Sequence, residues 1–274
     1  MAAQARRYTA PMDTPIFTLE RGTAPLLISL PHDGSTIPDD IAARMLPTAR
    51  GSVDTDWHVG QLYAPLAKVL GASLLRPAMS RYVVDLNRPA DGHALYPGRR
   101  ETGLLPTMGF DGAPLYPDGA EPDAAETGRR VDAFWRPYHQ ALQDELARLK
   151  AEHGRVVLWE GHSIRSVVPM LFDGRLPDFN LGTADGASCG AALQQRLAAR
   201  LAGQDGYTYV VNGRFKGGYI TRQYGCPAEG VQAVQLELAQ CNYMDEDTLA
   251  YRPELAAPVQ ALIGELLRGC LDAA

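Results

Sequence analysis

The sequence predicts an α/β protein with three layers, in which helices cover both faces of a mainly parallel central sheet. Short apolar runs, such as residues 25–30 and 156–159, are typical of buried parallel strands and alternate with segments of helical periodicity. Each of these two runs leads into a turn that carries a histidine, His32 after the first and His162 after the second. Because such sheets bind ligands beyond the carboxyl ends of their strands, we expect both histidines at a functional site.

The other elements are predicted in chain order. Residues 1–24 are polar and should form a peripheral arm or an edge strand. A helix is expected over 59–70, since acidic residues precede it and a glycine follows it. Pro137 should kink or break the longest helical pattern. Further strands are expected at 72–75, 81–86, 207–212 and 231–238, and further helices at 126–153, 187–201 and 255–271.

The segment from residue 89 to 125 is rich in glycine, proline and aspartate and lacks periodicity. At roughly 35 residues it exceeds the usual length of a connection, so we expect it to be functional, a lid or irregular. No internal repeat or linker divides the chain, and residues 1–274 are interpreted as a single catalytic domain.

The composition is ordinary for a soluble globular protein, with 46% hydrophobic and 21% charged residues. The net charge of −6 and the lack of a basic stripe argue against a nucleic-acid partner. No segment approaches the roughly 18 apolar residues of a membrane span, and no signal peptide is evident, so we expect a cytoplasmic protein. Four widely spaced cysteines indicate reduced thiols. The oligomeric state is left open.

His32 and His162 are the candidate metal ligands. Either histidine alone would more often be structural, but two imidazoles at strand ends favour a site for one divalent metal. A catalytic zinc ion takes three protein ligands, so a carboxylate or a third histidine is needed. Asp54 and Asp56 precede the predicted helix, where one can cap it and the other can bind metal. We favour Asp56 as the ligand, with Asp54 as its supporting partner or the alternative ligand, and Asp33 as a weaker alternative.

Two groups of polar residues predict an anionic small-molecule ligand. An arginine beside an asparagine suits carboxylate recognition, although a surface ion pair and a turn residue are the alternative. The first group occupies the predicted strand near residue 85: Arg81, Asn87 and Arg88. Arg81 begins this strand and should therefore lie apart from Arg88. The second group belongs to a loop whose paired glycines permit close approach to a ligand or a hairpin turn: Lys216, Gly217 and Arg222.

Glu237 is the candidate general base, because it interrupts an apolar strand at 234–238. A carboxylate there must face a partner, a metal site or water, and burial would raise its pKa toward a useful range. A salt-bridged structural glutamate is the alternative. His139 is a further candidate for the site, although a structural position on its helix is the more ordinary interpretation. No GxSxG motif supports a serine triad.

Together these segments resemble the N-formylglutamate amidohydrolase family. The matching motifs run in order along the chain: Pro31-His32-Asp33-Gly34, Asp54-Thr55-Asp56-Trp57, Ser80–Pro89, Arg136-Pro137-Tyr138-His139, Glu160-Gly161-His162-Ser163, Phe215–Arg222 and Gln235-Leu236-Glu237. The resemblance implies N-formylglutamate deformylase activity, in which water cleaves the formamide to give formate and L-glutamate at the end of histidine degradation. It also implies a fold similar to zinc carboxypeptidases and aspartoacylase-like hydrolases.

In that fold an Asn-Arg pair holds the substrate carboxylate and a strand glutamate activates water, roles that Asn87-Arg88 and Glu237 match. The resemblance thus implies one divalent metal, with Zn²⁺ the first choice. Those relatives carry a metal ligand three residues after the first histidine, where this chain has Ser35, so the third ligand is assigned to the Asp54/Asp56 pair. A deacylase for another N-acyl amino acid and a non-enzymatic dicarboxylate-binding protein are the alternatives.

Overall fold

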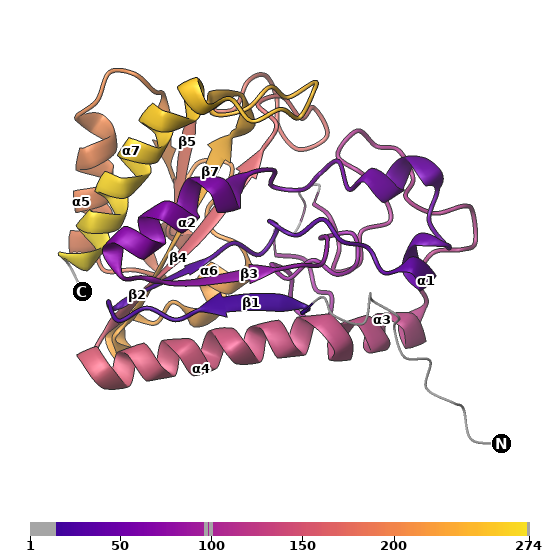
Figure 1. Cartoon of the computed structure of the whole chain (residues 1–274), viewed down its shortest axis with the longest axis horizontal. Coiled ribbons are helices and arrows are strands. Elements are labelled where there is room, and N and C mark those ends of the chain that lie inside the picture. The colour runs from indigo at the N-terminus through magenta and orange to yellow at the C-terminus, as the bar shows by residue number, and fades with distance from the viewer. Residues whose placement is uncertain (1–14, 96–97, 99–100, 273–274) are drawn as a thin grey trace.

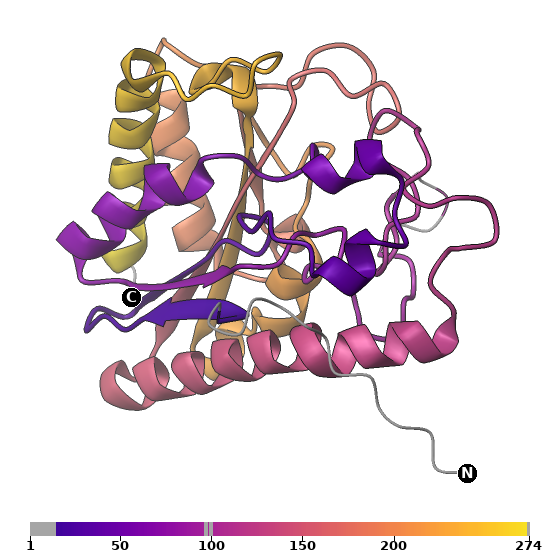
Figure 2. The ribbon, with the colours of Figure 1, turned by 45° about the vertical axis from the view of Figure 1, so that its right-hand side comes forward.

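The computed structural model describes residues 15–95, 98 and 101–272. Within these residues, helices cover both faces of a seven-stranded sheet (Figure 1 and Figure 2). Four of the six strand pairings are parallel, and the pairings of β1 with β3 and of β5 with β7 are antiparallel. In spatial order the strands are β1 (Phe17–Glu20), β3 (Ser73–Pro77), β2 (Leu26–Ser29), β4 (Val156–Ile164), β7 (Val231–Ala239), β5 (Phe179–Gly182) and β6 (Tyr209–Val211). The predicted three-layer, mainly parallel α/β fold is confirmed.

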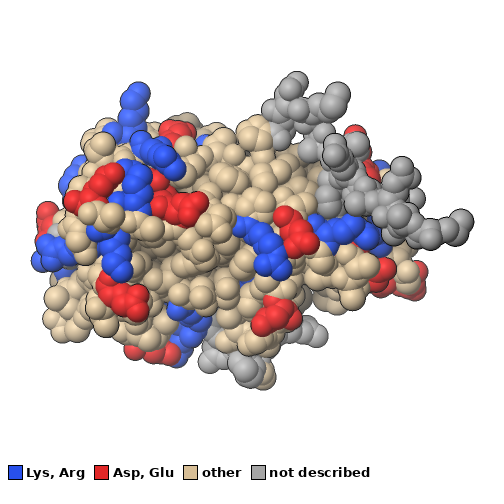
Figure 3. Space-filling view, turned by 90° about the horizontal axis from the view of Figure 1, so that it is seen from below, with Lys and Arg blue, Asp and Glu red and all other residues tan. Residues whose placement is uncertain are grey.

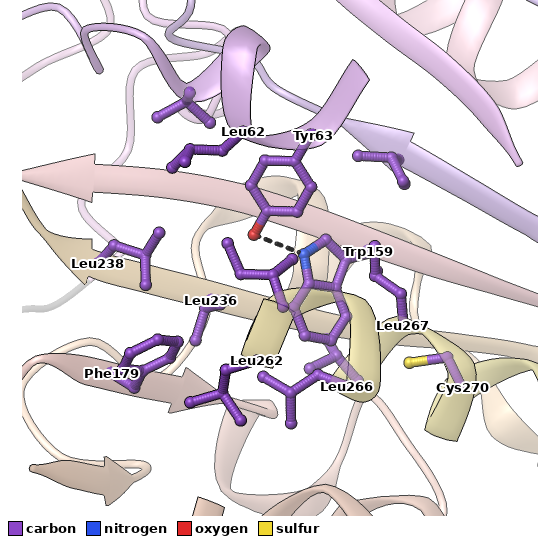
Figure 4. Packing of buried hydrophobic residues seen from close by; sticks show 14 of the residues in the cluster. Leu62, Tyr63, Trp159, Phe179, Leu236, Leu238, Leu262, Leu266, Leu267 and Cys270 are labelled. Atoms are coloured by element: carbon purple, nitrogen blue, oxygen red, sulfur yellow. Dashed lines mark hydrogen bonds between the residues drawn. The ribbon is translucent and has the colours of Figure 1, made fainter. Parts of the chain in front are cut away.

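Three helices cover one face of the sheet: α2 (Val59–Leu70), α5 (Ala191–Ala202) and α7 (Pro253–Leu271). Alternate side chains of the central strands point into this layer, among them Ile28 of β2 and Trp159 of β4. The buried indole N–H of Trp159 donates a hydrogen bond to the Tyr63 hydroxyl of α2 at 2.9 Å (Figure 4). This bond satisfies the one polar atom of the indole, so the large ring can fill the core without a desolvation cost.

The opposite face is covered mainly by α4 (Arg136–His153), with the shorter α6 (Tyr219–Tyr224) beside it. Leu27 and Leu158, each offset by one residue from the strand side chains of the other face, pack here. The exposed side of this layer carries basic and acidic side chains interspersed with one another (Figure 3). No helix within the described part of the chain has the length and hydropathy that a membrane crossing requires.

Where the sequence predicted that Pro137 kinks or breaks the long helix, a π-helical turn interrupts the α-helical run just before this proline. The Asp123 carboxylate caps α3 (Ala124–Arg130) by accepting from the Glu126 N–H at 2.7 Å. A π-helical turn at Val131–Trp135 then connects α3 to α4, whose first turn contains Pro137. A proline is tolerated at that position because the first turn of a helix leaves its N–H groups without intrahelical partners.

The prediction of a strand over 81–86 is wrong. This segment is a succession of turns, and all six of its residues are buried, not only every second one. Its backbone has no neighbouring strand and is satisfied by other groups. The Asp85 N–H donates to the Leu104 carbonyl at 2.7 Å, and the Leu86 carbonyl accepts from Nε2 of His139 at 2.9 Å. These long-range partners replace a sheet ladder, and alternation of residue types could not reveal them.

Other differences are smaller. The edge strand expected within residues 1–24 is β1, while residues 1–14 lie outside the described part of the chain. The sequence analysis missed β5, a four-residue strand that exists by pairing with β7 and β6. It also missed α6, and it began α5 four residues early. A short helix, α1 (Asp39–Ala42), was not expected either. All four cysteines are described, and none forms a disulfide.

His139 anchors α4 to the turns that follow Ser80. Its Nε2 must carry the proton, since the Leu86 carbonyl can only accept, and Nδ1 of the neutral ring accepts from the Tyr224 hydroxyl at 2.7 Å. The ring also stacks on Trp135 with 3.7 Å between the centroids. Burial lowers the pKa of His139 to about 4, so the neutral form is the native one at ordinary pH.

We therefore predict that His139 makes stability fall as the pH drops from 6.5 toward 4. In this window the unfolded chain takes up a proton that the folded chain excludes, so the free energy of unfolding rises with pH. The contribution, on the order of 3 kcal/mol, is fully present above the unfolded pKa and lost below the folded one.

Denaturant unfolding between pH 4 and 7 would measure this effect in the wild type, in His139→Gln and in His93→Gln, a matched change at an exposed histidine. His139→Gln should be less stable than the wild type at pH 7 and should show a shallower dependence on pH. His93→Gln should follow the wild type. Parallel curves for all three proteins would contradict a buried neutral His139.

Candidate metal centre and substrate cavity

Three buried side chains converge near the carboxyl ends of β2 and β4: His32, Asp56 and His162. His32 lies in the turn after β2, Asp56 in the turn before α2, and His162 in the last third of β4. One ligand atom from each residue lies within 4.8 Å of the other two. The two strands are parallel neighbours, which explains how the residues at and after their carboxyl ends meet at one edge of the sheet.

Carboxylates orient both imidazole rings. Nε2 of His32 lies 2.7 Å from Asp85, and Nε2 of His162 lies 2.7 Å from Glu160. The Nδ1 atoms of the two rings consequently face the Asp56 carboxylate, at 3.8 and 3.0 Å. A carboxylate on the outer nitrogen fixes the orientation of a histidine and increases the basicity of the nitrogen that can bind a metal.

These carboxylates are themselves held in place. Glu160 accepts hydrogen bonds from the backbone N–H of Thr221, at 3.0 Å, and from its hydroxyl. Asp85 accepts from the Arg81 guanidinium at 2.8 Å. Burial alone would raise the pKa of Asp85, but the adjacent His32 and Arg81 outweigh it and hold that pKa well below its usual range. Asp85 is thus an ionised partner for His32.

The charge at this site suits a bound cation. Four carboxylates are buried together, with one buried guanidinium beside them: Asp56, Asp85, Glu160, Glu237 and Arg81. Burial lowers the pKa of His162, but the Glu160 and Asp56 carboxylates outweigh it and raise that pKa well above its usual value. Buried carboxylates require positive partners. Two imidazole nitrogens and a carboxylate oxygen form a donor set that zinc accepts, so the residues present fit a divalent metal.

Glu237 lies next to His162, because the two are register partners on the parallel strands β7 and β4. Its side chain lines the same cavity as His32, Asp56 and His162. Burial raises the pKa of Glu237 to about 8; Asp56 adds to this shift, while His162 and Arg81 oppose it. A carboxyl group with a raised pKa can exchange a proton near neutral pH.

The cavity beside the cluster combines charged and apolar walls. Its lining includes three arginines, Arg81, Arg88 and Arg214, and four large apolar side chains, Phe110, Ile164, Leu171 and Phe215. Glu101 also lines it, and one of its carboxylate oxygens is buried with no hydrogen-bond partner among the described residues. Such a cavity suits a small ligand with both charged and apolar parts.

Asn87 and Arg88, predicted to bind substrate, line this cavity together with Arg81. The Asn87 amide nitrogen lies 3.0 Å from Nε2 of His162, and the Arg88 guanidinium donates to the Thr102 carbonyl at 2.7 Å. Arg81 was not expected to share the exact location of Arg88, and the two arginines line one and the same cavity. The turns that replace the predicted strand bring both arginines to one cavity.

The paired glycines serve the packing of Asn87. A Cβ atom at Gly218 would lie 2.3 Å from the Asn87 amide nitrogen, so no larger residue fits there. Gly217 has a φ of 113°, which other residues rarely adopt. The Ile220 N–H then donates to the Asn87 side-chain oxygen at 2.9 Å. The loop makes a close approach to Asn87 and not a hairpin, and Gly217, predicted to bind substrate, does not line the cavity.

Lys216 and Arg222, predicted to bind the anionic substrate, do not line the cavity. Lys216 forms an ion pair with Asp185 at 2.9 Å, and Nε of Arg222 donates to the Gly217 carbonyl at 2.9 Å. Arg214, from the same loop, lines it instead. The sequence analysis considered only the residues that flank the glycine pair, and inspection of the whole loop would have included this arginine.

Asp54 lies outside the cluster of His32, Asp56 and His162. Its carboxylate accepts from the Tyr82 hydroxyl at 2.6 Å and from the Phe110 N–H at 2.8 Å, which positions Phe110 in the cavity wall. Asp33, the weaker alternative, accepts from the Gly60 N–H at 2.8 Å in the first turn of α2. The helix cap expected of the Asp54/Asp56 pair is therefore supplied by Asp33.

His139 does not line the cavity, in keeping with its structural position on α4. The sequence analysis did not single out Asp85 or Glu160, the carboxylates that orient the two histidines. A signal for both exists in the sequence, because each lies two residues before a candidate, Asn87 or His162.

Comparison with known proteins agrees with these observations. The family model described as N-formylglutamate amidohydrolase matches residues 24–244. An N-formylglutamate deformylase of Pseudomonas aeruginosa is 54% identical over 257 residues, and one of Pseudomonas putida is 49% identical over 257 residues. Each alignment covers 93% of this chain and 96% of the relative.

A solved structure of N-formylglutamate amidohydrolase from Ralstonia eutropha JMP134 superimposes with a TM-score of 0.78 at 28% identity. That superposition covers 94% of this chain and 99% of the other. The matched region contains the histidines, the acidic residues and the arginines of the cavity described above. The chain therefore belongs to the N-formylglutamate amidohydrolase family, as its sequence motifs predicted.

Proposed function

We propose that this protein is a metal-dependent amidohydrolase that cleaves N-formyl-L-glutamate to formate and L-glutamate, the last step of a histidine-degradation route. The observation that carries the proposal is the convergence of His32, Asp56, His162 and Glu237 in a cavity with three arginines. The names of the two Pseudomonas relatives support the substrate. The seven strands of one sheet, from β1 to β7 in the described residues, support a single catalytic domain.

His32, Asp56 and His162 would hold the metal, and their donor set favours Zn²⁺. When bound, zinc supplies a Lewis acid that makes water easier to deprotonate and polarises the formyl oxygen. Asp85 and Glu160 keep the two rings in the orientation that presents Nδ1 to the site.

Glu237 accepts a proton from the attacking water as the water oxygen forms a bond to the formyl carbon. It then returns that proton to the nitrogen while the carbon–nitrogen bond breaks, which releases formate and the amine of L-glutamate. Arg81, buried beside Asp85 in the cavity wall, places a fixed positive charge where the formyl oxygen gains negative charge. The preorganised charge lowers the barrier because it needs no reorientation during the reaction.

Asn87 and Arg88 would bind the α-carboxylate, since Asn87 adjoins His162 and both residues line the cavity. The same machinery could act on another N-acyl amino acid, and a comparison of formyl, acetyl and succinyl substrates separates these candidates. Membership in a family of amidohydrolases argues against the alternative of a non-enzymatic dicarboxylate-binding protein.

We predict that His32→Ala and His162→Ala each lower metal content and activity together, because each removes one of three protein ligands. Elemental analysis of the purified protein and an assay of formate release would measure both quantities. His153→Ala serves as the matched control, because this histidine lies outside the cluster and its Nε2 contacts the Thr23 carbonyl and the Glu152 carboxylate. A histidine variant that keeps full metal stoichiometry would rule out that residue as a ligand.

We predict that substitutions of Asp54 and Asp56 have different effects on metal affinity. Asp56→Asn should weaken metal binding by more than about tenfold, since even changes beside metal ligands cause such losses. Asp54→Asn should keep wild-type affinity, because the Asp54 carboxylate binds Tyr82 and Phe110. Titration against a competing chelator measures the affinities. The reverse pattern would identify Asp54 as the ligand.

Glu237→Gln should keep the metal and bind substrate but lose kcat by roughly 10²–10⁴-fold, the usual contribution of a general base. Steady-state kinetics of formate release, together with metal analysis, distinguishes this loss from the loss of a ligand. Glu229→Gln, in the short 3-10 helix that precedes β7 and outside the cavity, is the control. Near-wild-type kcat in Glu237→Gln would show that the base is another residue.

A further inference from the structure

We infer that Arg214 binds the side-chain carboxylate of the substrate and thereby gives the enzyme its preference for acidic N-formyl amino acids. The inference rests on the proposed function and specifies how the same cavity selects among substrates. Neither the sequence motifs nor the comparisons assign a role to this residue.

A dicarboxylate brings two negative charges into a cavity that is lined by three guanidinium groups and by the Glu101 carboxylate. Arg81 already forms ion pairs within the site, with Asp85 at 2.8 Å and with Asp56 at 3.8 Å. Its charge is therefore balanced by carboxylates of the protein before substrate arrives. Arg88 and Arg214 are the two other arginines in the wall of this cavity.

The covalent structure of the substrate indicates which arginine binds which carboxylate. The α-carboxylate is attached to the carbon that bears the scissile nitrogen, so it must lie close to the reacting groups. Arg88 follows Asn87, whose amide nitrogen is 3.0 Å from Nε2 of His162, so this pair adjoins the metal centre. The side-chain carboxylate of glutamate lies two methylenes further from the scissile bond, and the remaining arginine of the cavity is Arg214.

The surroundings of Arg214 suit that end of the substrate. Its Nε donates to the Leu171 carbonyl at 2.8 Å, and its guanidinium carbon lies 5.3 Å from the centre of the Phe215 ring. These contacts hold the planar guanidinium in place before a ligand binds, which reduces the entropy lost on binding. Leu171 and Phe215 also line the cavity, so an apolar wall for two methylenes lies beside the charge.

The other basic residues of this loop are less suitable. Lys216 forms an ion pair with Asp185 at 2.9 Å, and Nε of Arg222 donates to the Gly217 carbonyl at 2.9 Å. Neither side chain lines the cavity. A role for Arg222 is the competing hypothesis that the experiment must separate from a role for Arg214.

The experiment compares kcat/KM for N-formyl-L-glutamate and N-formyl-L-glutamine, which differ in side-chain charge and hardly in shape. Arg214→Gln should lower the value for formylglutamate by about 10- to 100-fold, as expected when a charge-assisted contact is lost. Formylglutamine should change by less than about threefold, because it makes no such contact. Arg88→Gln should instead lower both values alike and leave their ratio unchanged.

Two further variants sharpen the test. Arg165→Gln removes a positive charge from a residue that pairs with Asp247 and does not line the substrate cavity, so it controls for a general loss of charge. It should leave both substrates unaffected. Arg214→Glu should reverse the selectivity, with a further loss for formylglutamate and a gain over the wild type for N-formyl-L-lysine.

The outcomes separate this inference from the proposed function. A metal-loaded wild type that releases no formate from formylglutamate would contradict the proposed function, and the inference would fail with it. A wild type that prefers formylglutamate, with an unchanged glutamate-to-glutamine ratio in Arg214→Gln, would overturn the inference alone. Loss of the preference in Arg222→Gln but not in Arg214→Gln would also overturn it, because it would assign the contact to Arg222.

Discussion

The pairing of two buried imidazole rings with carboxylates is the interaction on which the rest of this site depends. His32 and His162 can face Asp56 only because Asp85 and Glu160 hold their outer nitrogens. Burial of these charges is costly unless each has a partner, and the partners come from distant segments. Arg81 holds Asp85, and Thr221 at the start of α6 holds Glu160. The geometry of the site thus requires the sheet, the turns near residue 85 and α6 together.

Irregular backbone supplies most of the cavity, and the regular layers make that irregularity stable. Residues 81–87 are buried in these turns, so their polar groups need partners that a sheet would otherwise provide. Arg130 and His139, from the helical layer below, donate to two of these carbonyls. The helices that cover the sheet therefore have a second role, since they hold the segment that carries Arg81 and Asn87. A change in this layer can alter the site without touching it.

Local charge in the cavity differs from the charge of the whole chain. The protein has a net charge of −6, yet three arginines line one cavity beside a cluster of buried carboxylates. This arrangement separates two tasks in space. In the proposed function, the carboxylates and histidines hold a cation and accept a proton, while the arginines bind anionic groups. Arg81, which contacts the first group and lines the cavity of the second, connects the two parts.

The sequence by itself determined the three-layer α/β fold and brought His32, His162 and Glu237 to one edge of the sheet. It could do so because apolar runs mark buried strands, and the carboxyl ends of parallel neighbours meet at the same edge. Only the tertiary structure decided which aspartate lies beside the histidines, because the Tyr82 hydroxyl and the Phe110 N–H donate hydrogen bonds to the Asp54 carboxylate. The tertiary structure also decided that residues 81–86 form turns and not a strand. It likewise decided that Arg214 lines the cavity, whereas Lys216 and Arg222 do not. These outcomes depend on partners far apart in the chain, which no local pattern of residue types encodes.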